Sequence, residues 1–133
     1  MVFAADLMRR IDIPFTVEFI AAASYGRGTV SPGQVALNGL ERLEIAGRHV
    51  LLVEDILDTG LTTAVIVADL RSRCPTSVAI CTMLRKEAAR RRDLPVNYVG
   101  FEIPDEFVVG YGMDYAERYR NLRGVHRLVF EKG

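Results

Sequence analysis

The stretch that decides the fold runs from His49 to Leu84 and reads HVLLVEDILDTGLTTAVIVADLRSRCPTSVAICTML. It opens with an apolar run over 49–53, continues with a helical pattern over 62–73 and ends with an apolar strand over 77–84. A short apolar run bounded by a glycine and by acids is typical of a parallel strand buried on both faces. A strand, a helix and a second strand predict a βαβ unit. We therefore expect an α/β fold whose central, mostly parallel sheet is flanked by helices.

Shorter elements are expected on both sides of this unit, within a single domain over 1–133. An amphipathic helix is predicted over 1–10 and a mostly buried strand over 15–22. A glycine-rich flexible loop follows over about 24–36, and mobile loops often carry function. The remaining predictions are a short strand and turn over 34–44, an exposed basic segment over 86–92, and short strands over 96–101, 107–109 and 126–130.

The composition is that of a soluble globular domain of 133 residues, half of them hydrophobic and 26% charged. Basic and acidic residues number 17 each, so no broad electrostatic surface for nucleic acid or an anionic membrane is expected. No apolar run approaches the ~20 residues of a membrane span, and no signal peptide is evident. Cys74 and Cys81 are too few for a disulfide framework. These features predict a cytoplasmic protein without a nucleic-acid or membrane partner.

Three acids and two threonines surround a glycine between the first strand and the helix. Glu54 and Asp55 come at the carboxyl end of the strand, and 58–62 forms the turn into the helix. Gly60 permits close backbone approach, and a helix N-terminus offers unpaired N–H groups that suit a phosphate. Carboxylates accept hydroxyl protons and bind Mg²⁺. The alternative, that a turn residue only caps the helix while the acids are solvated, stays open from these residues alone.

A hydrophobic strand followed by EDxxDTGxT resembles the phosphoribosyl pyrophosphate signature of the type I phosphoribosyltransferases. The stretch VNYVGFEIPDEFVVGYGMDYAERYRNL over 96–122 resembles the hypoxanthine(-guanine) phosphoribosyltransferases, and the match extends to about residue 130. The resemblance implies purine salvage by this enzyme class (EC 2.4.2.8). A 5-phosphoribosyl group passes from phosphoribosyl pyrophosphate to hypoxanthine, and also to guanine, with release of pyrophosphate. It further implies Mg²⁺ as cofactor and a homo-oligomer, either a dimer or a tetramer.

The resemblance assigns roles around the glycine. Glu54 and Asp55 would hold the ribose hydroxyls of the donor. Asp58 is the candidate catalytic acid or base at the purine's imidazole nitrogen, because a carboxylate within hydrogen-bond reach can exchange that proton. The residues assigned to the 5′-phosphate are Asp58, Thr59, Gly60, Leu61 and Thr62. The residues assigned to the metal are Glu54, Asp55 and Asp114.

The purine site is assigned to residues of the C-terminal half. Phe107 would stack on the flat base, and the backbone of Val108 would read its edge. Lys86 is a donor only, so it would select a 6-oxo group over an amino group. Arg120 would bind pyrophosphate. From the residues alone, Phe107 also fits ordinary core packing, and the arginines near Lys86 fit a solvated basic face.

The loop that begins at Ser24 and Tyr25 resembles the family's active-site lid, whose closure would exclude water from the reacting centre. A plain surface loop is the alternative.

Members of the family also carry a first core strand and a Lys-Gly pyrophosphate loop ahead of the residue that matches Met1. Met1 is then either an internal methionine of a longer gene or the start of a fragment. We expect these 133 residues alone to bind the donor weakly, to turn over little or nothing, and to expose a strand edge at 50–53 or 15–22. Two alternatives stay open: a regulatory or binding protein of the same fold, and an inactive fragment. Retention of Lys86, Phe107 and Asp114 favours the enzyme.

Overall fold

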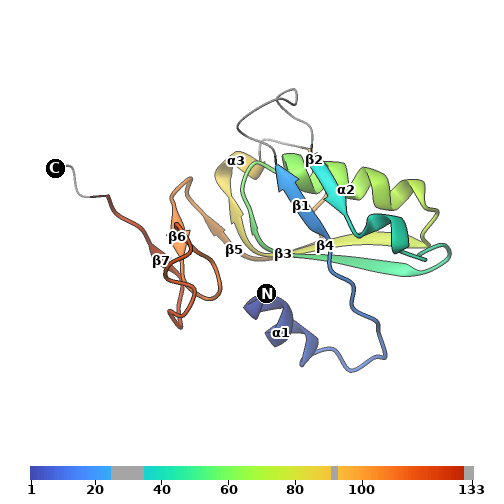
Figure 1. Ribbon diagram of the computed structural model, residues 1–133, viewed down its shortest axis with the longest axis horizontal. Helices are drawn as coiled ribbons and strands as arrows, with labels where there is room; N and C mark the ends of the chain where they lie inside the picture. Colours follow the sequence, from blue (N-terminus) through green and yellow to red (C-terminus); the bar gives the residue numbers. More distant parts are fainter. Residues whose placement is uncertain (25–34, 91–92, 131–133) are drawn as a thin grey trace.

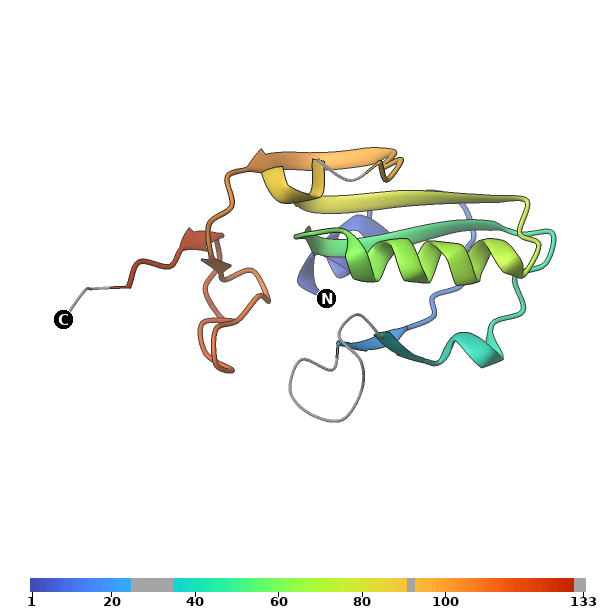
Figure 2. The same ribbon diagram turned by 90° about the horizontal axis from the view of Figure 1, so that it is seen from above.

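The computed structural model describes residues 1–24, 35–90 and 93–130, and its centre is a three-stranded parallel sheet (Figure 1). Strands β3 (His49–Leu57), β4 (Ser77–Lys86) and β5 (Tyr98–Ile103) lie in the order β3-β4-β5. Helix α2 (Leu61–Ser72) covers one face of the sheet, and α1 (Val2–Met8) lies against the other (Figures 1 and 2). The predicted α/β fold with a parallel sheet flanked by helices is confirmed.

Two small antiparallel ribbons complete the described structure. Strands β1 (Ala21–Ser24) and β2 (Val35–Asn38) pair beside α2 and lead into the 3₁₀ helix η1 (Leu40–Arg42). Strands β6 (Val108–Val109) and β7 (His126–Arg127) pair in the C-terminal segment, residues 104–130. A short helix, α3 (Glu87–Arg90), follows β4. In the described residues, no helix has the length and apolarity needed to cross a membrane.

Two apolar clusters hold the layers together. The first lies between α2, η1 and the sheet, and its buried members are Leu40, Ile66 and Leu70. The second joins the carboxyl ends of the strands to α1 and to the C-terminal segment, and its buried members are Met83, Leu84 and Met113. Phe3 of α1 and Tyr111 of the C-terminal segment both pack against this second cluster. The carboxyl ends of the strands, where the functional residues are predicted, are therefore supported by a packed apolar cluster.

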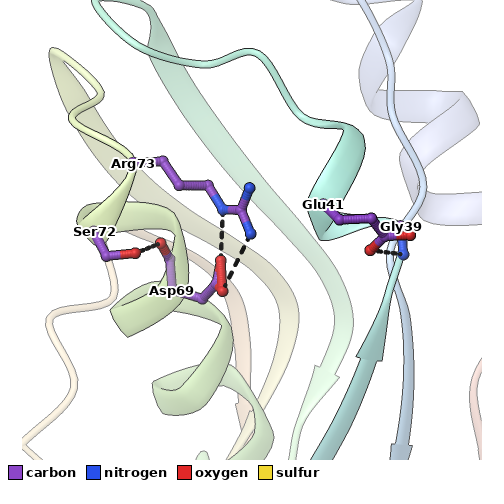
Figure 3. A network of polar contacts seen from close by, with 5 residues as sticks. All are labelled: Gly39, Glu41, Asp69, Ser72 and Arg73. Carbon is purple, nitrogen blue, oxygen red and sulfur yellow. Dashed lines mark hydrogen bonds and ion pairs between the residues drawn. The ribbon is translucent and has the colours of Figure 1, made fainter.

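Polar contacts stabilise the C-terminal end of α2, which lies away from the carboxyl ends of the strands (Figure 3). Arg73 donates from Nε to Asp69 Oδ1 at 2.6 Å, and Ser72 donates to the Asp69 carbonyl at 2.6 Å. On the neighbouring ribbon, the Gly39 amide donates to Glu41 Oε2 at 3.1 Å (Figure 3). A cation beside the last turn also complements the negative end of the helix dipole.

The strand predicted over 15–22 is wrong in position and in burial. Only Ala21–Ser24 is paired, with β2, and residues 13–20 form no strand. Phe15, Val17 and Phe19 are exposed, with 72% of the Phe19 surface open to solvent. The apolar alternation is present, but no strand in the described part of the chain pairs with this segment, so its apolar side chains have no sheet to pack in.

The prediction that the first strand of the unit is buried on both faces is also wrong. β3 lies at the edge of the sheet, and Leu51 is 40% exposed. The strand is longer than predicted, since it continues through Leu57. The basic segment after β4 differs as well, because Lys86 is buried at 8% exposure and begins the turn from the sheet into α3. The other predicted helices and strands are found within a few residues of their predicted positions.

Candidate functional site

The turn predicted to hold a phosphate joins the end of β3 to the start of α2 (Figure 2). Gly60 caps the helix in the left-handed region, with φ +76°, where a side chain would be strained. Thr59 Oγ1 accepts a long hydrogen bond of 3.4 Å from the Leu61 amide. The following N–H groups of the first helical turn have no acceptor within the helix. The turn has the backbone geometry that an anion at a helix N-terminus requires.

Glu54 and Asp55 lie within β3 rather than after it, so their side chains leave the strand on opposite faces. Glu54 faces α2, where Oε1 accepts a 2.8 Å hydrogen bond from the Thr63 hydroxyl. Asp55 faces α1, where Oδ2 lies 2.6 Å from the amino group of Met1. The prediction that both acids directly follow the strand is therefore inaccurate, because β3 continues through Leu57.

Burial has the largest effect on the pKa of Glu54. Loss of solvent around the side chain raises the pKa of its carboxyl above the ordinary value of 4.5, and the charge of Asp55 raises it further. The hydrogen bond from Thr63 opposes both effects because it favours the ionised form. The Thr63 hydroxyl thus supports a charged acceptor where the sheet environment disfavours one.

Lys86, Asp58 and Phe107 come together at the carboxyl ends of β3 and β4. Lys86 Nζ lies 3.0 Å from Asp58 Oδ2 and 5.9 Å from the centre of the Phe107 ring. Phe107 is 46% exposed, which disagrees with ordinary core packing and leaves ring surface for a ligand. Val108 follows it at the start of β6. The arrangement offers a donor, an acceptor and an aromatic face within one small volume.

The Phe107 ring is held by other aromatic residues. Tyr115 packs edge-on against it, with ring centres 5.4 Å apart and an angle of 84° between the planes. Phe130 packs on Tyr115 at the same distance. Edge-to-face pairs of this kind are favourable beyond their buried area. The candidate stacking residue is therefore part of an ordered cluster.

Asp114 and Arg120 form an ion pair in the C-terminal segment, with Nη2 and Oδ1 3.0 Å apart. The Glu117 amide donates to the other Asp114 oxygen at 2.8 Å, and Arg120 Nη1 donates to the Gly112 carbonyl at 2.8 Å. The loop is anchored on α1, because the Tyr111 hydroxyl donates to Asp6. This hydrogen bond lowers the pKa of Asp6 and raises that of Tyr111.

The predicted metal ligands do not form a preassembled site. In the described ranges, no three histidine, cysteine or carboxylate side chains converge as ion ligands, so Asp114 does not join Glu54 and Asp55 in one cluster. Mg²⁺ commonly takes only one or two protein carboxylates together with substrate phosphates and waters. Hard carboxylate oxygens are the donors that this ion prefers, so the residues present fit a metal bound with its phosphate ligand.

The predicted lid falls mostly outside the described residues. Ser24 ends β1, whereas Tyr25 lies in the part of the chain that the structure does not describe.

The sequence patterns did not indicate Thr63, Tyr111 or Tyr115 as part of the site. The only local signal for Thr63 was a second threonine directly after Thr62.

Comparison with known proteins agrees with this geometry. The family model described as the phosphoribosyl transferase domain matches residues 1–116, so the chain belongs to the type I phosphoribosyltransferases. Within that family its relatives are the hypoxanthine(-guanine) phosphoribosyltransferases. The hypoxanthine phosphoribosyltransferase of Haemophilus influenzae is 47% identical over 98% of this chain and 73% of the relative. The hypoxanthine-guanine phosphoribosyltransferase of Mycobacterium avium is 50% identical over 92% of this chain and 60% of the relative.

A solved structure extends the agreement to three dimensions. The crystal structure of a hypoxanthine-guanine phosphoribosyltransferase from Bacillus anthracis superposes with a TM-score of 0.86 at 46% identity. The superposition covers 96% of this chain and 75% of that protein. The chain is thus shorter than these relatives and shares their fold over nearly all of its own length.

Proposed function

We propose that this chain transfers the 5-phosphoribosyl group of phosphoribosyl pyrophosphate to hypoxanthine, and also to guanine, in purine salvage. The observation that carries the proposal is the contact of Lys86 with both Asp58 and Phe107, directly beside the Asp58–Thr62 turn. This arrangement supports a 6-oxopurine site next to a phosphate site. The relatives at 47–50% identity carry the names of this activity.

The donor would be held from its phosphate end. Its 5′-phosphate accepts from the N–H groups of the turn, and its ribose hydroxyls donate to Glu54 and Asp55 in the carboxyl-terminal half of β3. The opposite faces taken by the two carboxylates mean that each would contact a different side of the ribose. Arg120 would meet the pyrophosphate once it leaves its pairing with Asp114.

The purine would lie on Phe107 with its oxo edge toward Lys86. Lys86 donates to the 6-oxygen, and Asp58 exchanges a proton with the imidazole nitrogen on the same edge of the ring. The opposite imidazole nitrogen attacks the anomeric carbon with inversion while the bond to pyrophosphate breaks. Asp114 and the ribose acids Glu54 and Asp55 would hold Mg²⁺, which would neutralise the charge of the pyrophosphate.

The direct test mixes the chain with phosphoribosyl pyrophosphate, Mg²⁺ and hypoxanthine and quantifies inosine monophosphate by chromatography. Because the sequence predicts little or no turnover, the assay uses micromolar enzyme and the Haemophilus influenzae relative as a positive control. Donor binding is measured in parallel by calorimetry. Product formation that requires both substrates supports the proposal. Donor binding without product would favour the binding-protein alternative. The absence of both donor binding and product would refute the proposed activity.

A dimeric or tetrameric state and a cytoplasmic location stay predictions from the sequence.

A further inference from the structure

Thr63 carries a polar contact that the proposed chemistry has not yet used. It is the third residue of α2, and only 2% of its surface is exposed. A helical threonine commonly turns its hydroxyl back to a carbonyl of the preceding turn. Here the hydroxyl donates instead to Glu54 Oε1 on β3, at 2.8 Å. A hydroxyl has one proton to donate, so this donor is committed to the carboxylate.

We propose that Thr63 is a positioning residue for the donor's ribose, acting through Glu54. The inference rests on the proposed function, and it adds a residue outside the EDxxDTGxT pattern. Glu54 has three rotatable bonds, and the Thr63 hydroxyl fixes one of its two oxygens. The second oxygen is then presented in a single orientation to a ribose hydroxyl at the strand end. Thr63 sits on the same helical turn as Gly60, so one rigid element sets both the phosphate turn and the acid.

Precise placement of this acceptor matters because binding energy depends on hydrogen-bond geometry. Thr63→Val keeps the shape of the side chain and removes the donor. The Glu54 carboxylate would then lose its fixed orientation and a charge-assisted hydrogen bond. A side chain that has to be ordered on binding lowers affinity by about two- to tenfold. Donor affinity should therefore fall about two- to tenfold, whereas kcat at saturating donor should change by less than that.

Two matched variants separate positioning from simple loss of a buried hydroxyl. Thr63→Ser retains the donor and should restore donor affinity to near the wild-type value. Thr82→Val removes another fully buried hydroxyl on the neighbouring strand, one that donates to the Leu84 carbonyl at 2.8 Å. It should leave donor affinity unchanged. Melting temperatures verify that each variant is folded, and Thr63→Cys replaces the valine variant if that one does not fold.

The experiment measures the KM and the calorimetric Kd of Mg²⁺–phosphoribosyl pyrophosphate for these variants, alone and combined with Glu54→Ala. If Thr63 acts through Glu54, Thr63→Val has no further effect once the Glu54 side chain is absent. Wild-type affinity in Thr63→Val, or an undiminished effect in the Glu54→Ala background, would overturn the inference and leave the proposed function intact. A wild-type chain that neither binds the donor nor forms product would remove the proposed function, and this inference with it.

Discussion

Lys86 and Asp58 join the ends of two neighbouring strands by an ion pair of 3.0 Å, although 28 residues separate them in the sequence. The lysine is nearly buried, whereas the aspartate side chain is 61% exposed. The pair therefore has one fixed partner and one partner that a ligand can approach. A 6-oxopurine carries its acceptor oxygen and an imidazole nitrogen on the same edge. That edge can contact the donor Lys86 and the acceptor Asp58 together. Binding would replace the ion pair between them with hydrogen bonds to the base.

Asp58→Asn should lower turnover far more than it weakens donor binding. The amide keeps the shape of the turn but cannot take up the purine proton, so we expect a loss of roughly 10²–10⁴-fold in kcat. Asp69→Asn, near the far end of α2, where the carboxylate accepts from Arg73, is the matched control. Near-normal turnover of Asp58→Asn at saturating substrates would exclude Asp58 as the acid or base.

Lys86→Gln should discriminate between purines. The variant loses a charged donor to the 6-oxygen, so kcat/KM for hypoxanthine should fall roughly tenfold to a hundredfold. The residual rate with adenine should not fall in parallel, because an amino group gains nothing from the lysine. Arg90→Gln removes a neighbouring cation that pairs with Glu102 at 3.0 Å and serves as the control. An equal loss for both bases would remove Lys86 from the purine site.

The hydrogen bond from Tyr111 to Asp6 predicts a specific pH dependence of stability. It lowers the pKa of Asp6 in the folded state, so its contribution is complete above the ordinary value of 3.8 and is lost as the pH falls through the folded-state pKa. It also raises the pKa of Tyr111 above 10.0, so the contribution is lost again as the pH rises through that higher value. Tyr111→Phe should therefore be less stable than wild type between these limits only.

Denaturant unfolding at pH 7 and at pH 2.5 measures this difference. The gap in unfolding free energy between wild type and Tyr111→Phe should be present at pH 7 and should shrink at pH 2.5. Tyr119→Phe, which alters a partly exposed tyrosine of the same loop, should show no gap at either pH. A gap for Tyr111→Phe that is independent of pH would mean that the ring, not the hydrogen bond to Asp6, anchors the loop.

The segment before β1 predicts self-association. Phe15, Val17 and Phe19 alternate along an unpaired extended segment and are all exposed, a pattern that favours contacts between chains. Light scattering after gel filtration should show a mass that rises with protein concentration, and Phe19→Lys should reduce that rise. Phe101→Lys alters a similarly exposed phenylalanine on the edge strand β5 and should have less effect. A wild-type chain of constant monomeric mass would contradict the prediction.

The parts of the site that are contiguous in sequence were predictable. The turn and the acids between Glu54 and Thr62 could be located from the sequence, because a strand followed by a helix fixes that connection locally. The order of side chains in a strand also explains why the two acids diverge, once β3 is known to extend through Leu57. The sequence pattern does not report where a strand ends to that accuracy.

Contacts between distant elements were not predictable in the same way. The hydrogen bond of Thr63 to Glu54 depends on how α2 is rotated over the sheet, which no local pattern specifies. The burial expected at 15–22 failed because an apolar alternation reports a tendency to pair, whereas burial requires a partner strand. Lys86 could be assigned only by its place between a strand and the purine segment, and its burial against Phe107 emerged from the fold.

A crystal structure of the chain with inosine monophosphate and Mg²⁺ tests the central claim most directly. We expect the 5′-phosphate on the Asp58–Thr62 turn, the ribose hydroxyls at Glu54 and Asp55, and the purine on Phe107. We also expect the 6-oxygen within hydrogen-bond distance of Lys86 Nζ. A nucleotide bound with its base away from Phe107 and Lys86, or with its phosphate away from the turn, would refute the proposed site.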